Sequence, residues 1–331
     1  MTAAATAVAY PNIALVKYWG KRDEEYRLPM TGSISLTLDL FPTTTTVTVA
    51  PGATIDAVCI DDAPPSRPAT QRVQQFLGLV RALAGRREHA TVQTTNSGPT
   101  AAGLASSAAG FAALAVAAAA AYELELDPIA LSRLARRGSG SACRSVFGGF
   151  TCWRAGAGLG PDGDATSYAE PLPRGTMDPA MVVAIVDATP KPISSTVAMR
   201  HTVATSPCYW AWSASCLQDL IEMRKALADG ELVTVGEIAE RNALGMHAAM
   251  LAARPAVRFL TPASLAVLDR VAKLRVDGIA AYATIDAGPN VKVLCEAAAA
   301  DVVAAGLRAV ETVQSVHIGR PGPAPTLRRL R

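Results

Sequence analysis

The segment at residues 99–110 has the composition of a loop that binds phosphate. Its sequence, PTAAGLASSAAG, combines small residues, which let a ligand approach the backbone, with the hydroxyls of Ser106 and Ser107. A helix is expected to begin there, and a helix N-terminus offers unpaired N–H groups and positive partial charge. The segment lacks the Gly-Lys-Ser/Thr of a Walker A loop. It predicts a site for nucleoside triphosphate; the alternative is an ordinary small-residue turn before a packed helix.

One carboxylate and one arginine stand out for their surroundings. Asp286 ends an apolar stretch and precedes Ala-Gly-Pro-Asn. It could interact with a substrate hydroxyl, or it could only stabilise the turn. Arg144 is the only charged residue between Gly138 and Gly149. Its planar guanidinium matches a carboxylate, and a structural ion pair is the alternative.

A third group lies near the start of the chain. Lys17 and Lys21 flank Tyr18, Trp19 and Gly20. The lysines could contact anionic groups while the aromatic rings shape a pocket. The alternative is a pair of lysines on a surface turn, with their aliphatic stems covering apolar neighbours.

The residue pattern predicts strands and helices that alternate along the chain and that would carry these candidate site residues. Alternating or β-branched residues predict strands, and apolar residues at helical spacing predict helices. The second half reads as strands and helices with an antiparallel pair, which is typical of an α+β lobe. The expected strands are 33–38, 43–49, 90–95, 150–153, 181–187, 279–286, 291–295 and 313–318, and the expected helices are 71–84, 128–137, 209–227, 233–253, 262–275 and 298–310.

The bulk properties limit the function classes. The 331 residues are 50% hydrophobic and carry a net charge of +3, which allows two domains and gives no argument for nucleic-acid binding. The apolar stretch 108–122 is too short to span a bilayer and predicts a buried helix. The six cysteines form no CxxC pair, which indicates reduced thiols and a cytoplasmic protein. The four histidines lack the spacing of metal ligands, so a histidine metal site is not expected. The basic residues 327–331 are expected to form a solvated tail.

Four segments in order carry a resemblance. They are residues 11–21 (PNIALVKYWGK), 99–110, 136–144 (RRGSGSACR) and 286–290 (DAGPN). Together they resemble the GHMP small-molecule kinase superfamily and, more narrowly, its diphosphomevalonate decarboxylase family. The resemblance implies an α+β, GHMP-kinase-like fold of two lobes with a deep cleft between them: an N-terminal lobe at residues 1–175, similar to ribosomal S5 domain 2, and a ferredoxin-like C-terminal lobe at residues 176–331.

The same resemblance implies an activity. Members of the family phosphorylate the tertiary 3-hydroxyl of (R)-mevalonate 5-diphosphate with ATP and then release phosphate and CO2, leaving isopentenyl diphosphate. ATP as cosubstrate, Mg²⁺ and a homodimer are therefore expected. Related kinases carry an aspartate in a loop resembling Ser-Gly-x-Asp, whereas residues 139–144 read Ser-Gly-Ser-Ala-Cys-Arg. This difference favours a decarboxylase. A decarboxylase acting on the 5-monophosphate, a kinase that stops at phosphorylation, and a nucleotide sensor without turnover remain alternatives.

Site roles follow from the matched motifs. Asp286, Arg144 and Lys17 correspond to the catalytic groups, with Arg144 holding the substrate carboxylate and Lys17 near the leaving phosphate. Substrate contacts are expected from Tyr18, Trp19, Gly20, Lys21, Arg72, Ser139, Gly140, Ser141, Ala142, Cys143 and Thr196. ATP contacts are expected from Pro99, Ala101, Ala102, Gly103, Leu104, Ala105, Ser106 and Ser107.

Overall fold

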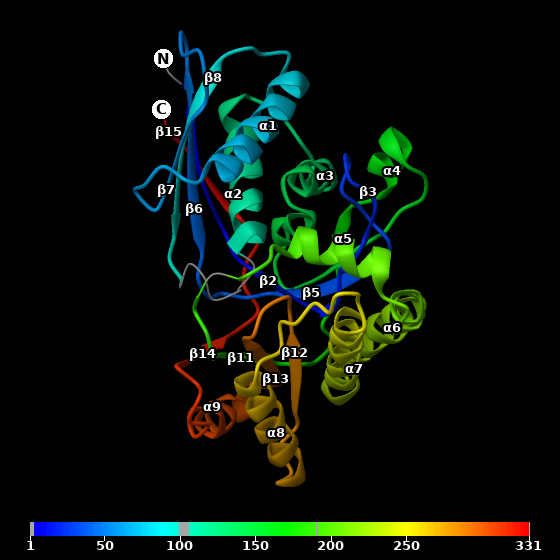
Figure 1. The fold of residues 1–331 in the computed structure, drawn as a ribbon. Helices are drawn as coiled ribbons and strands as arrows, with labels where there is room; N and C mark the ends of the chain where they lie inside the picture. Colours follow the sequence, from blue (N-terminus) through cyan, green and yellow to red (C-terminus); the bar gives the residue numbers. More distant parts are fainter. Residues whose placement is uncertain (1–2, 99–105, 190, 331) are drawn as a thin grey trace.

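The computed structural model describes residues 3–98, 106–189 and 191–330, which fold into three main β-sheets with helices packed against them (Figure 1). The α+β class predicted from the sequence is confirmed. None of the described helices is long and apolar enough to cross a membrane.

The first sheet lies in the upper half of Figure 1, with helices against one of its faces. Four of its strands are antiparallel neighbours, and β7 joins β8 in parallel. Its strand order is β15 (Thr326–Leu330), β1 (Ala4–Ala9), β6 (Thr43–Ala50), β8 (His89–Asn96) and β7 (Ala57–Ile60). The helices of this half are α1 (Arg67–Ala84), α2 (Ser106–Ala121) and α3 (Pro128–Gly138).

Helix α2 explains the apolar stretch that opens at the phosphate-type loop. The helix packs across β1 and β6, and every residue from 111 to 121 is buried. Alanine side chains let the helix axis approach the sheet closely, since close packing of small side chains leaves little room between backbones. The predicted buried helix is confirmed. This packing holds the N-terminus of α2 in a fixed position at the lower edge of the sheet (Figure 1).

A second sheet continues toward the middle of the molecule. Its inner strands are buried throughout, as expected for strands covered on both faces. The strand order is β10 (Ala169–Pro171), β9 (Phe150–Trp153), β5 (Ser33–Thr37) and β2 (Asn12–Val16). The short hairpin β3 (Lys21–Asp23) with β4 (Leu28–Pro29), the 3₁₀ helix Gly140–Val146 and helix α4 (Gly160–Thr166) complete this part.

The third sheet forms the lower half of the molecule. Its order is β12 (Ala281–Ile285), β13 (Val291–Glu296), β11 (Pro179–Ile185) and β14 (Ser315–Gly319). Helices α8 (Pro262–Val276) and α9 (Ala300–Arg308) pack with one face. Helices α6 (Tyr209–Asp229) and α7 (Leu232–Leu251) share a core with the other face and with β2 and β5. Helix α5 (Ser195–Thr205) lies above them. One hydrophobic core therefore joins the two halves.

The C-terminal segment is solvated, as expected, and it is also part of the first sheet. Residues 326–330 form β15, which pairs antiparallel with β1 at the edge of that sheet. Arg328 and Arg329 are exposed, so these basic side chains stay in water while the backbone of the strand pairs with β1. The boundary at residue 175 falls between β10 and β11 and stays a prediction, with the qualification that the last strand returns to the first sheet.

Candidate active site

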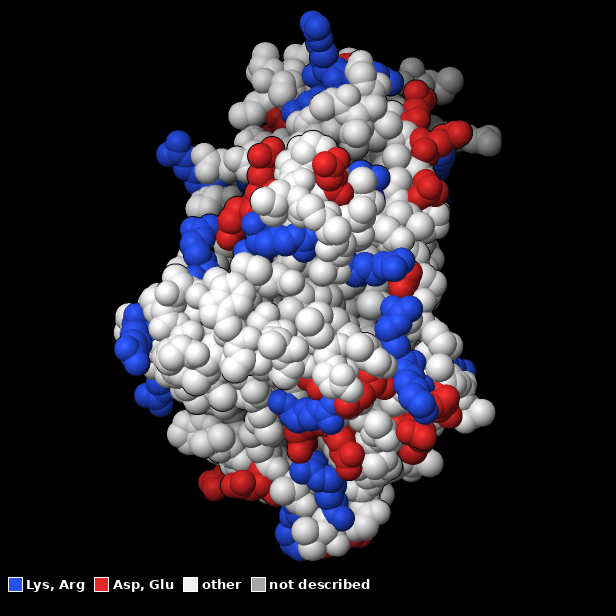
Figure 2. Space-filling view, turned by 90° about the vertical axis from the view of Figure 1, so that its right-hand side faces the viewer, with Lys and Arg blue, Asp and Glu red and all other residues white. Residues whose placement is uncertain are grey.

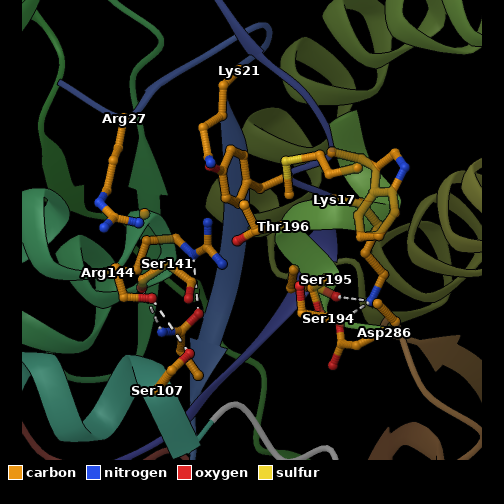
Figure 3. Close-up of a pocket in the computed structure, with 18 of the residues that line it drawn as sticks. Lys17, Lys21, Arg27, Ser107, Ser141, Arg144, Ser194, Ser195, Thr196 and Asp286 are labelled. Carbon is orange, nitrogen blue, oxygen red and sulfur yellow. Dashed lines mark hydrogen bonds and ion pairs between the residues drawn. The ribbon is translucent and has the colours of Figure 1, made fainter. Parts of the chain in front are cut away.

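A cavity of about 290 Å³ lies where the two halves meet (Figure 3). Among the described residues, six cationic side chains and one carboxylate line it. Such an excess of positive charge in a partly desolvated cleft favours a ligand with several negative charges. The ionisable lining residues are Lys17, Lys21, Arg27, Arg72, Arg144, Lys191 and Asp286.

Asp286 lies at one end of the cavity between two lysines. It follows β12, and Lys17, which follows β2, donates from Nζ to Asp286 Oδ1 at 2.7 Å and to the Ala14 carbonyl at 2.8 Å. Lys292, on β13, lies with Nζ 3.3 Å from Asp286 Oδ2. The side chains of Lys17 and Lys292 are 2% and 1% exposed, whereas that of Asp286 is 24% exposed. Asp286 is therefore the member of this trio that a ligand can reach most easily.

The charges of this trio perturb one another. Burial would raise the pKa of Asp286, but the adjacent Lys17 and Lys292 outweigh it and hold that pKa well below its usual range. For Lys17 the balance is reversed: burial lowers its pKa to about 8, although Asp286 acts in the opposite direction. The backbone N–H of Lys17 also donates to Asn242 Oδ1 on α7, which fixes the residue in place. Near neutral pH the carboxylate is ionised and the lysine is close to its titration range.

Arg144 is also buried, but its partners are neutral. Its Nε donates to Asn12 Oδ1 at 3.0 Å and to Ser35 Oγ at 2.9 Å, and Nη1 donates to Ser33 Oγ at 2.5 Å. Within the described ranges no carboxylate lies within ion-pair distance of Arg144, so the structural ion pair considered above is not found there. The side chain is nearly fully buried and lines the cavity. An uncompensated, pre-oriented guanidinium is suited to an incoming anion.

A third cluster of cations lies away from Asp286 (Figure 3). Arg72 donates from Nε and Nη2 to the Gly138 carbonyl, and its guanidinium lies 4.6 Å from the centre of the Phe111 ring. Burial, aided by the charge of Arg27, lowers the pKa of Arg72 to about 10. Lys21 pairs with Glu24 at 2.7 Å. These guanidinium and ammonium groups can bind a phosphate-bearing end of a ligand.

Two aromatic side chains contribute unused hydrogen-bond donors. The hydroxyl of Tyr18 and Nε1 of Trp19 are buried and have no partner among the described residues. The Tyr18 ring packs on Trp153 with 4.6 Å between centroids. A Cβ on Gly140 would lie 2.8 Å from the Tyr18 hydroxyl, so only glycine leaves room for it. Burial also raises the pKa of Tyr18, which keeps its proton available as a donor.

The structure brings together most of the predicted residues that it describes. Ser107 at the start of α2 lies with Oγ 3.4 Å from Ser139 Oγ, and both line the cavity. Also lining it are Lys17, Tyr18, Trp19, Lys21, Arg72, Gly140, Ser141, Arg144, Thr196 and Asp286. Ser106 begins α2. Pro99, Ala101, Ala102, Gly103, Leu104 and Ala105 lie outside the described residues.

Three predicted residues do not line the cavity. Ala142 packs into the core of the first half, and Cys143 packs against Trp153, because successive residues of a 3₁₀ helix point in different directions. Gly20 adopts a φ of 113° beside Tyr209, whose hydroxyl would lie 1.9 Å from an added Cβ. These three residues pack against the residues around the cavity, and none of them presents a side chain to it.

Sequence reasoning missed several residues. Arg27, Lys191, Ser194 and Asn12 line the cavity, and Lys292 lies behind Asp286. A signal existed for Lys292, since a charge in the otherwise apolar strand 291–295 needs a buried partner. Arg27 carries no comparable pattern and reaches the cavity only because the β3–β4 hairpin turns back toward α3.

A second cavity of about 210 Å³ adjoins the first and shares Arg72 and Ser107 with it. Val73, Val92, Phe111 and Leu114 provide apolar walls, and Thr94 and Asn96 provide polar groups. A flat, mainly apolar ring with a few polar atoms would fit this composition.

Comparisons with known proteins agree with this arrangement. Residues 9–169 match a family described as the diphosphomevalonate decarboxylase-like N-terminal domain, and residues 181–318 match the mevalonate 5-diphosphate decarboxylase C-terminal domain. The diphosphomevalonate decarboxylases of Aspergillus fumigatus and Homo sapiens are each 36% identical, over 92% and 87% of this chain and 80% and 76% of theirs.

Solved structures match along the whole chain. The mevalonate diphosphate decarboxylase from Enterococcus faecalis is 41% identical, with a TM-score of 0.93 and 100% of both chains covered. A structure with the same identity, TM-score and coverage is described as MDDEF in complex with MVAPP, AMPPCP and magnesium. The enzyme from Staphylococcus aureus is 36% identical, with a TM-score of 0.94, and the match covers 100% of this chain and 99% of that one.

Proposed function

This chain belongs to the diphosphomevalonate decarboxylase family, and we propose that it converts (R)-mevalonate 5-diphosphate and ATP to isopentenyl diphosphate, ADP, phosphate and CO2. The observation that carries the proposal is the buried Arg144, which has no acidic partner among the described residues and shares a cavity with Asp286. Related kinases carry an aspartate in this loop, whereas this chain carries Arg144 and no acidic residue at positions 139–144. The solved relative that holds MVAPP and AMPPCP adds support.

The charge pattern of the cavity supports one orientation of the substrate. Its carboxylate would contact Arg144, since the guanidinium fork matches two carboxylate oxygens. Its diphosphate would contact Arg72, Arg27 and Lys21. Its 3-hydroxyl would then lie toward Asp286 and Lys17, which occupy the other end (Figure 3).

ATP would approach from the N-terminus of α2. The loop at residues 99–110 and the Ser107 hydroxyl would contact its phosphates, and the adjoining apolar cavity would hold the adenine. Mg²⁺ prefers oxygen ligands and usually keeps several waters beside substrate phosphates. The donors here fit that habit, because hydroxyls such as Ser107 provide oxygens and the one carboxylate among the described cavity-lining residues, Asp286, is already paired with Lys17 and Lys292, which leaves the metal mainly to phosphates and waters. When bound, the metal would neutralise phosphate charge.

The residues at the Asp286 end fit a two-stage reaction. Ionised Asp286 would accept a hydrogen bond from the 3-hydroxyl and align its oxygen with the γ-phosphorus of ATP, since phosphoryl transfer through a loose transition state needs mainly positioning. As the new O–P bond forms, the bond from the γ-phosphorus to the ADP oxygen would break, and the hydroxyl proton would pass by way of Asp286 to water. The bond between C3 of the substrate and the oxygen of the new phosphate group would then break, and its electron pair would leave with the phosphate. Electrons of the carbon–carboxylate bond form the alkene, and CO2 leaves past Arg144. Lys17 would stabilise charge on the departing phosphate.

The deciding experiment supplies ATP, Mg²⁺ and either mevalonate 5-diphosphate or mevalonate 5-phosphate. We expect CO2 release with the diphosphate and a higher kcat/KM than with the monophosphate. ATP turnover without CO2 and with a stable 3-phosphorylated product would instead identify a kinase. A higher kcat/KM for the monophosphate would identify the sibling decarboxylase, and ATP binding without any product would favour a sensor.

We also propose a homodimer, which the outer face of α6 supports. Trp210, Leu217 and Ile221 share one side of this helix and are 60%, 60% and 66% exposed. Figure 2 views the side on which α6 lies and shows a broad area at mid-height without charged side chains. Sedimentation velocity checks the state, and a monomer at micromolar concentration would contradict it. The two-lobe division at residue 175 and the cytoplasmic location, which rests on the reduced cysteines, remain predictions.

A further inference from the structure

Lys292 is a buried charge for which the reaction described above has no task. It lies on β13, opposite Thr284 of β12. Its Nζ approaches Asp286 Oδ2 at 3.3 Å and donates to the Asn290 carbonyl at 3.2 Å. It is 1% exposed and does not line the cavity. A lysine ammonium loses much hydration energy on burial, so its position needs an explanation.

The two lysines that flank Asp286 differ in what they can reach. Lys17 lines the cavity and is 2.7 Å from Asp286 Oδ1, so its ammonium can turn toward a ligand. Lys292 is 1% exposed, does not line the cavity and also donates to the Asn290 carbonyl, so its ammonium stays beside Oδ2. If Lys17 alone neutralised Asp286, moving it to a phosphate would leave a partly buried carboxylate without a counter-charge, which is unfavourable in a desolvated site. With Lys292 in place, Asp286 keeps one cation at every stage.

We propose that Lys292 is a fixed counter-charge that keeps Asp286 ionised and oriented while Lys17 moves its hydrogen bonds to the phosphates of the ligands. This is a positioning role: Lys292 acts through Asp286 and does not touch the substrate. It rests on the proposed function in so far as the moving partner of Lys17 is a phosphate of ATP or of its product.

The other groups around Asp286 do not supply this charge. His247, on α7, is buried, and burial, aided by the charge of Lys17, lowers its pKa to about 4, so it is neutral near pH 7. Arg144, from the 3₁₀ helix, makes its hydrogen bonds to Asn12, Ser33 and Ser35. Lys191 lies at the cavity and its Nζ donates to Ser195 Oγ at 3.3 Å. Among the described residues only Lys17 and Lys292 form ion pairs with Asp286.

The first test compares Lys292→Met with Lys292→Arg in kcat and kcat/KM from pH 6 to pH 10. We expect the methionine variant to lose roughly 100-fold in kcat, as for one broken buried ion pair, with a smaller change in KM. The fall of its kcat/KM at alkaline pH should move to higher pH. The reason is that Lys17 loses the repulsion of Lys292 and becomes the sole partner of Asp286, which raises the pKa of Lys17. The arginine variant should recover most of the rate. Lys273→Met removes the same charge from an exposed site on α8 and is the matched control.

If Lys292 had only a structural role, its replacement would lower the amount of folded enzyme without changing the pH at which kcat/KM falls. A Lys292→Met variant with wild-type kcat and an unchanged alkaline fall of kcat/KM would overturn the proposal. Should the methionine variant fail to fold, the Lys292→Arg variant decides instead, because it keeps the positive charge beside Asp286. We expect it to fold and to keep most of the rate, and a folded arginine variant with a loss of about 100-fold in kcat would contradict the counter-charge.

A second measurement needs no turnover and so separates this proposal from the proposed function. Thermal unfolding of wild type, Asp286→Asn, Lys292→Met and the double variant forms a double-mutant cycle. We expect the Tm loss of the double variant to be clearly smaller than the sum of the two single losses. Additive losses would overturn the pairing even in an active enzyme. Strong coupling in a protein that releases no CO2 would leave the pairing intact and reject only the function.

Discussion

The cavity contains two buried cations that are treated in opposite ways by their surroundings. Lys17 faces the carboxylate of Asp286 at 2.7 Å, whereas Arg144 is held by the amide oxygen of Asn12 and the hydroxyls of Ser33 and Ser35. The lysine is neutralised within the protein and the arginine is not. The arginine is therefore prepared to bind an anion that the ligand supplies, whereas the lysine already has an anionic partner and can exchange it for another during a reaction.

The scaffolds of the two cations match this division. Arg144 lies in a 3₁₀ helix and is braced by β2 and β5, the buried strands of the second sheet. Lys17 and Asp286 follow β2 and β12, which belong to different sheets. Helix α7 packs against both strands, and Thr284 Oγ1 of β12 donates to the Ala14 carbonyl of β2 at 3.2 Å. A rigid fork suits orientation of a carboxylate, and a junction between sheets suits groups whose partners change.

The largest expected effect comes from removing the charge of Asp286, the anion that neutralises Lys17 but not Arg144. Asp286→Asn should lower kcat by about 10³-fold or more, because the amide neither accepts the hydroxyl hydrogen bond as strongly nor pairs with Lys17. Affinity for ADP and for the substrate should change little, since other residues carry those contacts. Steady-state kinetics and calorimetric titration measure the two effects. Asp229→Asn on α6 is the control, and turnover within tenfold of wild type would exclude a catalytic role for Asp286.

The next test concerns Arg144. Arg144→Met should lower kcat/KM by about 100-fold, since a charge-assisted bidentate contact with the substrate carboxylate is lost. Arg144→Lys should restore little of it, because an ammonium cannot reproduce the fork held by Asn12 and Ser33. The affinity for ATP alone, measured by titration, should stay within a few-fold. If the lysine variant retained full kcat/KM, the preorganised fork would have no special role.

The catalytic side of this comparison could be predicted from local motifs. Lys17, Arg144 and Asp286 lie in short segments of unusual composition, and the fold needed only to bring three such segments to one cavity. Helix α2 and the 281–295 hairpin were likewise predictable, because continuous apolar or small residues determine burial locally.

The parts that could not be predicted depend on contacts distant in sequence. The charge of Lys292 in an apolar strand indicates that it has a buried partner, but the identity of that partner follows only from the register of β12 with β13, which places Lys292 behind Asp286. Ala142 and Cys143 were expected at the substrate because they lie within a motif, yet the pitch of the 3₁₀ helix directs them into the core. The pairing of β15 with β1 spans nearly the entire chain. No local pattern encodes such a contact.

The titration of Lys17 provides a milder test. Burial places its pKa near 8, and the protonated form is the one that can bind phosphate. The kcat/KM of wild type should therefore fall above pH 8 and be roughly tenfold lower at pH 9 than at its maximum. In Lys17→Met this limb should be absent and the rate low throughout. An identical limb in that variant would assign the titration to another group.

The smallest expected effect lies at the third cluster of cations and concerns substrate choice. Arg72 is partly buried beside Phe111 and bonded to the Gly138 carbonyl, so Arg72→Met removes one of several charges facing the diphosphate. The loss in kcat/KM should be about fivefold for mevalonate 5-diphosphate, close to the value of one partly screened ionic contact, and smaller for the 5-monophosphate. Arg67→Met, at the exposed start of the same helix, is the control. Equal losses for both substrates would mean that Arg72 senses overall charge and not the outer phosphate. The expected result, a larger loss for the diphosphate than for the monophosphate, would show that this cluster, and not Arg144 or Lys17, selects the substrate.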